Sequence, residues 1–371
     1  MLSLSRSLTA LLSLSFLVTA FAGCKTLPPV VRSHAEIVVA AEKAGLKELW
    51  HHRVPLLGNE KLVNIWRVTD SIYVTTSNAH LLRYNALTGE LVWNIEIGNP
   101  AWPIYRPADV PDSPYILVVN RGRGFRIHKL TGEFERQGNL TFAASTDPIV
   151  TDNKSFLVGG VESFRSVYLD FGGTKWNVTA PGNVFTVRPA LEGEAVFISS
   201  EQGRLWRVNT YYGEWTWKDR IIGTGSRVVG GIAADSRAVY VPALDGKVFA
   251  FDMTNGTNIW TKLIDGANLN QDLLCTRSDL LVPATGRGIY NLSTATGDVK
   301  WFAPGIAKIG TIIRDRIWAS DRGGNIHAIS LNNGERLAST NVGGSIIYNN
   351  VDNLVLTVTP AGEITAYTAN R

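Results

Sequence analysis

The chain has 371 residues, of which 45% are hydrophobic and 18% are charged, and its formal net charge is +4. This apolar content is typical of a packed globular protein and excludes an intrinsically disordered chain. The positive charge is spread along the sequence without a basic run, which argues against a nucleic-acid partner.

The first element in chain order is an N-terminal export signal. Arg6 precedes an apolar stretch from Leu8 to Phe21, which is too short for a membrane span and has the length of a signal-peptide core. The stretch ends in Phe21-Ala22-Gly23-Cys24, which resembles a bacterial lipobox. We therefore expect residues 1–23 to be a signal peptide and Cys24 to carry a lipid. An ordinary secretory signal cut nearby is the alternative.

The lipobox resemblance implies a lipoprotein of the cell envelope that faces the periplasm. Lys25 follows the cysteine where an aspartate would favour retention in the inner membrane, so the outer membrane is the expected anchor. Once Cys24 carries lipid, Cys275 is the only cysteine left in the mature chain, and no internal disulfide is expected. Residues 24–45 are predicted to be a tether, and few helices are expected in the mature chain.

From residue 46 onward the chain is built of one repeat. Eight short turns recur at separations of 37 to 43 residues, and each is followed by a short apolar strand. The turns are Asp70-Ser71, Asp112-Ser113, Asp152-Asn153, Glu192-Gly193, Asp235-Ser236, Arg277-Ser278, Arg314-Asp315 and Asp352-Asn353. A period near 40 made only of short strands predicts an all-β fold, an eight-bladed β-propeller of four-stranded antiparallel blades over residues 46–371. A two-sheet sandwich is the alternative.

A second series of glycines and tryptophans runs out of phase with these turns. The glycines are Gly89, Gly132, Gly172, Gly213, Gly256, Gly297 and Gly334, and the tryptophans that follow most of them by four residues are Trp93, Trp176, Trp217, Trp260 and Trp301. This series has seven members, one fewer than the turns. Trp50, 43 residues before Trp93, supplies the missing one. We therefore predict that a strand from the N-terminus completes the last blade and closes the ring.

The repeat resembles the tryptophan-docking repeats of the quinoprotein (PQQ-dependent) dehydrogenase superfamily, most clearly in Asp252-x-x-x-Gly256-x-x-x-Trp260. The pattern is incomplete in the second and seventh blades, where Arg136 and Ala338 stand in the tryptophan position. The enzymes of the superfamily hold pyrroloquinoline quinone over Ca²⁺, often with adjacent cysteines. This chain has no adjacent cysteines and no calcium-loop spacing.

The non-catalytic branch of the superfamily includes lipoproteins of the outer-membrane β-barrel assembly machine. The lipobox, short tether and bare ring resemble that plan, which implies a scaffold that binds a protein partner and acts as a monomer within a complex. No catalytic residue, cofactor or metal is expected. A PQQ-dependent oxidoreductase and a glycan-binding propeller that uses aromatic residues remain alternatives; the aromatic residues are Trp102, Tyr211, Tyr212 and Trp215.

Two groups of arginines are the candidate partner-binding residues. Arg106-Pro107, Asp147-Pro148 and Arg188-Pro189 occupy similar positions in consecutive blades, and we expect them to line the central channel with alternating charge. Ion pairs between blades are the structural alternative. Arg121 and Arg123 form a basic turn in the second blade, which is either an anion-binding loop or a solvated turn. The six histidines show no metal-ligand spacing, and the adjacent His51 and His52 should point to opposite faces of a strand.

Overall fold

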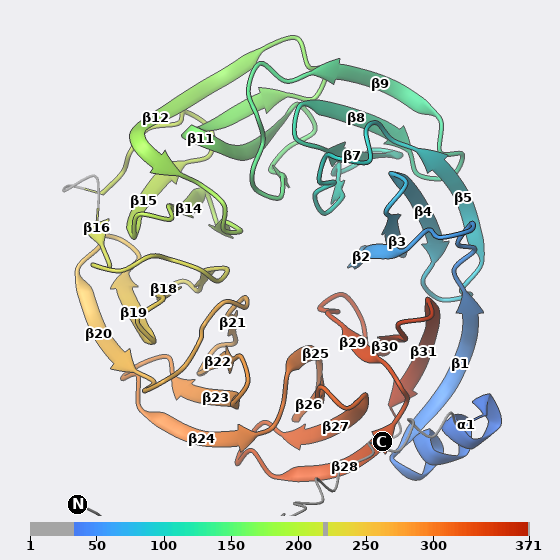
Figure 1. Cartoon of the computed structure of the whole chain (residues 1–371). Coiled ribbons are helices and arrows are strands. Elements are labelled where there is room, and N and C mark those ends of the chain that lie inside the picture. The colour runs from blue at the N-terminus through green and yellow to red at the C-terminus, as the bar shows by residue number, and fades with distance from the viewer. Residues whose placement is uncertain (1–32, 218–221, 370–371) are drawn as a thin grey trace, which may run out of the picture.

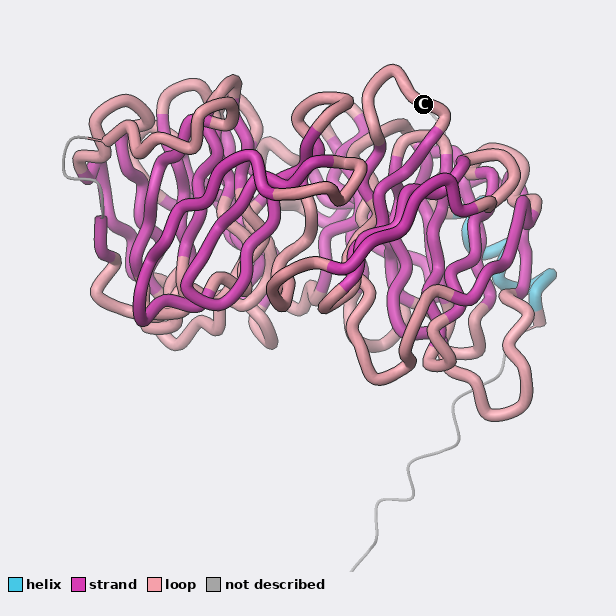
Figure 2. The backbone as a smooth tube through the Cα atoms, turned by 90° about the horizontal axis from the view of Figure 1, so that it is seen from above, coloured by secondary structure: helices cyan, strands magenta, loops and turns pink. Residues whose placement is uncertain are grey.

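The computed structural model describes residues 33–217 and 222–369, and these residues form a closed ring of eight β-sheets around a central channel (Figure 1). The eight-bladed propeller is confirmed. Seen from the side, the strands cross the thickness of the ring and the loops gather at its two ends (Figure 2). The predicted signal peptide and Cys24 lie outside the described residues.

Each blade runs from an innermost strand at the channel to an outermost strand at the rim, and neighbouring strands are antiparallel. Blade 1 contains β2 (Leu62–Val68), β3 (Ser71–Thr76), β4 (His80–Asn85) and β5 (Leu91–Glu96). Blade 2 contains β6 (Ala108–Asp109), β7 (Tyr115–Val119), β8 (Arg123–His128) and β9 (Phe134–Asn139). Blade 3 contains β10 (Ile149–Val150), β11 (Ser155–Tyr168) and β12 (Thr174–Val184). Blade 4 contains β13 (Ala190–Glu192), β14 (Ala195–Ser199), β15 (Arg204–Asn209) and β16 (Ile222–Gly223).

The second half of the ring repeats the pattern. Blade 5 contains β17 (Ala233–Ala234), β18 (Ala238–Pro242), β19 (Lys247–Asp252) and β20 (Asn258–Leu263). Blade 6 contains β21 (Leu274–Cys275), β22 (Asp279–Ala284), β23 (Gly288–Ser293) and β24 (Val299–Pro304). Blade 7 contains β25 (Lys308–Ile313), β26 (Arg316–Ser320), β27 (Asn325–Ser330) and β28 (Arg336–Asn341). Blade 8 contains β29 (Ser345–Ile347), β30 (Leu354–Val358), β31 (Glu363–Ala369) and β1 (Leu46–Arg53).

The eight recurring turns connect the first and second strands of their blades, so the segments before them are the innermost strands, as expected. The second strands are buried along their whole length in β3, β14 and β18 because both of their faces pack against neighbouring blades. The outermost strands alternate between buried and exposed residues, as in β5. The core is therefore a series of inter-blade layers.

Blade 3 is divided into three strands instead of four because one of them, β11, is 14 residues long. The backbone N–H of Leu169 donates to the carbonyl of Lys154 at 2.8 Å, although a continuous strand would separate these residues by about 50 Å. Glu162 lies at the middle of β11 with a φ of 56°. The chain therefore folds back near Glu162, and β11 supplies both the second and the third strand of the blade.

The N-terminal strand closes the ring at the rim. β1 pairs with β31 in antiparallel register from Leu46 opposite Ala369 to Arg53 opposite Glu363, with one irregularity between Glu48 and Trp50. The blue strand β1 and the red strand β31 lie side by side in Figure 1. Without β1, the strand β31 would present a row of unpaired backbone groups to solvent.

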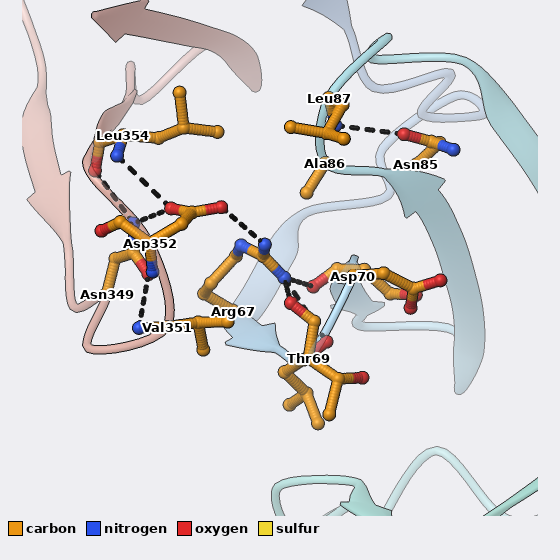
Figure 3. Close-up of polar contacts among 12 residues, drawn as sticks. Arg67, Thr69, Asp70, Asn85, Ala86, Leu87, Asn349, Val351, Asp352 and Leu354 are labelled. Atoms are coloured by element: carbon orange, nitrogen blue, oxygen red, sulfur yellow. Dashed lines mark hydrogen bonds and ion pairs between the residues drawn. The ribbon is translucent and has the colours of Figure 1, made fainter.

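A second contact closes the ring near the channel (Figure 3). Arg67, at the end of β2 in blade 1, places Nη2 2.7 Å from Oδ2 of Asp352, in the turn after β29 of blade 8. The other carboxylate oxygen of Asp352 accepts hydrogen bonds from Asn349 Nδ2 at 2.7 Å and from the Leu354 backbone at 3.1 Å. Because the Arg67 side chain is only 2% exposed, its charge depends on this partner.

Six tryptophans dock onto the next blade in the same way. In each case the indole N–H donates, at 2.7 to 3.1 Å, to the backbone carbonyl of the first residue after the third strand of the next blade, in the turn that leads to the fourth strand. The rings are those of Trp50, Trp93, Trp176, Trp217, Trp260 and Trp301, and they cover Gly89, Gly132, Gly213, Gly256, Gly297 and Gly334. These glycines have φ values of 73° to 76°, and a Cβ on any of them would come within 3.0 Å of the ring above it. Glycine is therefore required both for the turn and for the docking.

In the two repeats that lack the docking tryptophan, other side chains occupy its place. In blade 2, Arg136 Nε donates to the carbonyl of Asp170 at 3.2 Å, and Phe171 reaches back from blade 3 over Gly124 and Gly138. Phe171 also has a positive φ of 59° in that turn, whereas Gly172, the member of the glycine series there, does not have a positive φ. The turn in blade 3 therefore differs in conformation from the other turns of the glycine series.

In blade 7 the small Ala338 leaves room for a helix that the sequence did not predict. α1 (His34–Lys43) packs against β28 and β1, and its Ala41 is fully buried in one cluster with Ile37, Leu46 and Ala338. Ser33 caps the helix, and the Glu36 carboxylate accepts the backbone N–H of Ser33 at 2.8 Å. Part of the predicted tether is thus fixed to the ring. Within residues 33–217 and 222–369 no helix is long and apolar enough to cross a bilayer.

Candidate functional site

The charged residues before the innermost strands do line the channel. Arg106, Asp147 and Arg188 each lie two residues before the innermost strand of blades 2, 3 and 4, and Asp272 has the same place in blade 6. Two cavities of about 430 and 450 Å³ share these four side chains. The four residues, called the channel ring below, therefore stand at the junction of the two cavities.

The carboxylates of the channel ring bind backbone groups of the preceding blade. Asp147 Oδ1 accepts the backbone N–H of Arg106 at 3.0 Å, and Asp272 Oδ1 accepts that of Gly231 in blade 5 at the same distance. Arg188 Nη1 lies 3.8 Å from Asp272 Oδ2, a long contact between side chains that are 41% and 59% exposed. Such an exposed pair contributes little to stability.

The arginines of the channel ring are only partly neutralised. The Arg106 guanidinium donates to the carbonyl of Arg67 at 2.8 Å and has no carboxylate within 4.0 Å among the described residues. Burial lowers the pKa of Arg106, and the nearby charge of Arg188 lowers it further. Burial also raises the pKa of Tyr348, which lines the same cavity as the two arginines. Asp147 and Asp272 equal the two arginines in number, but the only contact within 4.0 Å between these guanidinium and carboxylate groups is that of Arg188 with Asp272.

Two further channel residues were missed by the sequence analysis. Lys308, at the start of β25, and Tyr348, just after β29, line the cavity of about 430 Å³ together with the channel ring. Burial lowers the pKa of Lys308. Neither residue belongs to a repeated motif, so the sequence held no signal for them beyond their distance from the turns.

Arg121 and Arg123 are not brought together with Arg106 and Arg188. Arg121 is exposed in the turn between β7 and β8 of blade 2. Arg123 is the first residue of β8, and its Nη2 donates to Gln137 Oε1 at 2.9 Å. Neither residue lines the two channel cavities. The indole of Trp102, which is 36% exposed, lies beside this turn, 3.4 Å from where a Cβ on Gly122 would stand.

The other candidate groups do not form a single site. Tyr211 and Tyr212 are exposed on the turn after β15 in blade 4, whereas Trp215 packs against Trp206. No described ring contact joins Trp102 to these three aromatic residues. The His51 ring contacts Thr365 at 3.0 Å and the His52 ring lies beside Trp50. In the part of the chain that the structure describes, no group of three or more His, Cys, Asp or Glu is placed to hold a metal ion.

The fold and its docked tryptophans define the chain as an eight-bladed propeller of PQQ-like repeats. The family model described as outer membrane protein assembly factor BamB matches residues 29–219, 143–273 and 214–368. These matches span nearly the whole ring, and the chain belongs to this family.

Individual relatives are distant. Outer membrane protein assembly factor BamB of Bordetella pertussis is 20% identical over 301 residues, which is 75% of each chain. The protein of the same description from Burkholderia pseudomallei is 25% identical over 121 residues, and the match spans only 30% of that relative. The crystal structure of BamB from Moraxella catarrhalis superposes with a TM-score of 0.68 at 16% identity, covering 87% of this chain and 99% of that one. The computationally designed Ika8 protein gives a TM-score of 0.66 at 12% identity, covering 86% and 98%. These structural likenesses concern the fold alone.

Proposed function

We propose that the protein is a non-catalytic scaffold, anchored by lipid at Cys24 in the outer membrane, that holds a protein partner during outer-membrane protein assembly. The observation that carries the proposal is the family match along residues 29–368, because the propeller fold by itself serves many functions. The relatives' description as assembly factors supplies the expected process.

Helix α1 limits how far the ring can stand from the membrane. Because Ser33 is fixed to the ring as the cap of α1, only nine peptide links separate it from Cys24. Nine extended residues span at most about 30 Å. A lipid on Cys24 therefore keeps the side of the ring formed by blades 7 and 8 close to the bilayer, and it leaves blades 2 to 5 farther away for partners.

The surface of blade 2 around Trp102 and Arg121 has the composition of a protein-binding site. Exposed tryptophan and arginine are the residue types that most often dominate the binding free energy of protein interfaces. Arg123 stands beside them and adds positive charge. We call these three residues the blade 2 surface.

The backbone that carries the blade 2 surface is held in place before a partner arrives. Asn120 Oδ1 accepts the backbone N–H groups of Gly122 at 3.1 Å and Arg123 at 2.8 Å. The Arg121 carbonyl accepts the N–H of Ala144 in the following loop at 2.8 Å. Because these loops are already ordered, binding loses little conformational entropy.

Site-specific crosslinking tests the proposal. A photoreactive amino acid in place of Trp102 should crosslink, in intact cells, to a protein component of outer-membrane assembly that mass spectrometry identifies. The double variant Trp102→Ala/Arg121→Ala should capture at least tenfold less of that partner, because truncation of interface hot spots typically weakens binding by about 2 kcal/mol or more.

A matched control distinguishes loss of the blade 2 surface from general destabilisation of the fold. Tyr212→Ala/Arg204→Ala removes another exposed aromatic residue and another exposed arginine, both in blade 4. It should leave capture unchanged. Crosslinks to glycans alone, or equal loss of capture in both double variants, would reject the blade 2 surface as the docking site.

A further inference from the structure

The cavity at the channel ring carries more positive than negative charge. Four cations and two carboxylates line it: Arg67, Arg106, Arg188, Lys308, Asp147 and Asp272. Arg67 is neutralised by Asp352 behind the wall. Three cations, Arg106, Arg188 and Lys308, therefore face the two carboxylates, and both carboxylates also accept backbone N–H groups.

Lys308 makes no ion pair with another described residue. No carboxylate lies within 4.0 Å of its ammonium group among the residues that the structure describes, and its pKa is lowered by burial. Arg106 likewise lacks an ion-pair partner. Partly buried cations without a counter-ion are costly, and a bound anion would relieve that cost.

Most of the other residues that line the cavity are apolar. Side chains of β2, β21 and β25 and of neighbouring segments form this part of the wall, namely Leu62, Ile65, Trp66, Leu273, Pro283 and Ile309. Its volume of about 430 Å³ lies within the range of roughly 300 to 1,000 Å³ usual for small-molecule sites. An apolar wall with a few converging cations suits an organic anion better than a bare inorganic ion. Arg188 and Asp272 are exposed to the channel, so a small solute can reach the ring.

We propose that this cavity is a binding site for a small organic anion, a carboxylate on an apolar body, held by Arg106, Arg188 and Lys308. The Tyr348 hydroxyl, which also lines the cavity, supplies an additional hydrogen-bond donor. Charge-assisted hydrogen bonds from arginine to carboxylate are among the stronger polar contacts in proteins. This inference goes beyond the scaffold function and does not depend on it.

Calorimetric titration with phthalate, an aromatic dicarboxylate, tests the site. The full-length lipoprotein in detergent, at constant ionic strength, should bind phthalate saturably with one site per chain. Arg106→Gln/Arg188→Gln and the separate variant Lys308→Gln should each weaken binding at least tenfold. Arg121→Gln, which removes a cation outside the cavity, should bind phthalate as the wild type does. Circular dichroism and the unfolding midpoint show whether each variant has kept its fold.

Inorganic phosphate provides the second arm of the experiment. Phosphate should bind at least tenfold more weakly than phthalate, because it cannot contact the apolar wall. Equal affinities for the two would overturn the organic part of the proposal. Absence of saturable phthalate binding, or unchanged binding by both folded channel variants, would overturn the site itself. Loss of partner capture in Trp102→Ala/Arg121→Ala is read separately, so the scaffold function and the anion site can fail independently.

Discussion

Replacing a single docked tryptophan should reveal how strongly the blades hold one another. Trp260 is 8% exposed, and its indole N–H donates to the carbonyl of Thr294 in the next blade at 3.0 Å. Its ring lies over Gly297 and 5.8 Å from the ring of Tyr240. Trp260→Ala removes all of these contacts and leaves a cavity between blades 5 and 6.

The expected loss can be estimated from area and from comparable substitutions. A buried tryptophan removes about 150–250 Å² from water, or about 4–6 kcal/mol at 25 cal/mol per Å² as an upper bound. Phe or Trp to Ala substitutions in cores typically destabilise by about 3–5 kcal/mol. We expect Trp260→Ala to lower the free energy of unfolding by about 3–5 kcal/mol.

The chain offers a matched control at the equivalent position of blade 2. Arg136 is exposed and makes one hydrogen bond to the Asp170 carbonyl, so Arg136→Ala should cost only about 0.5–1.5 kcal/mol. Urea denaturation followed by circular dichroism measures both variants, with the slope checked for constancy. A loss in Trp260→Ala within about 1 kcal/mol of that in Arg136→Ala would refute the inter-blade docking energetics.

Two further predictions concern the turn glycines and the inner closure. Gly334→Ala and Gly182→Ala place alanine at φ values of 73° and 72°, but a Cβ meets the Trp301 ring at 2.7 Å only in the first. Gly334→Ala should therefore destabilise by about 1–3 kcal/mol more in thermal or urea unfolding, and equal losses would contradict the docking role. Burial alone would raise the pKa of Asp352, but hydrogen bonds and the ion pair with Arg67 lower it overall. Its stabilising contribution is present above the unfolded pKa of about 3.9 and is lost as the pH falls through the folded pKa. Asp352→Asn should lower the unfolding midpoint most at neutral pH. If the difference in midpoint between the wild type and Asp352→Asn does not become smaller below about pH 4, that result would count against the ion pair.

Most of the fold could be predicted because each repeat carries its own local signals. A turn such as Asp70-Ser71 and a glycine such as Gly256 act within a few residues, and the mismatch between eight turns and seven glycines showed that an N-terminal strand closes the ring. Arg136 and Ala338 were visible as exceptions. What fills their places was not predictable, because Phe171 and helix α1 act through packing between segments that the repeat does not relate.

The candidate site was predicted only in part. The positions of Arg106, Asp147 and Arg188 in the channel followed from their equivalent places in three repeats, and the structure confirms that placement. Lys308 and Tyr348 stand six and four residues before their turns, as Arg106 and Arg188 do, but neither is followed by the proline that marked the other three positions. Their convergence depends on the circular arrangement of the blades.

The most direct test of the ring is to remove its N-terminal strand. In a variant lacking residues 46–54, hydrogen exchange measured on β31 and light scattering of the purified protein report on the exposed edge. The closure described here predicts that the β31 amides lose their protection and that the variant associates. A monomeric variant with β31 protection and an unfolding midpoint equal to those of the full chain would contradict it.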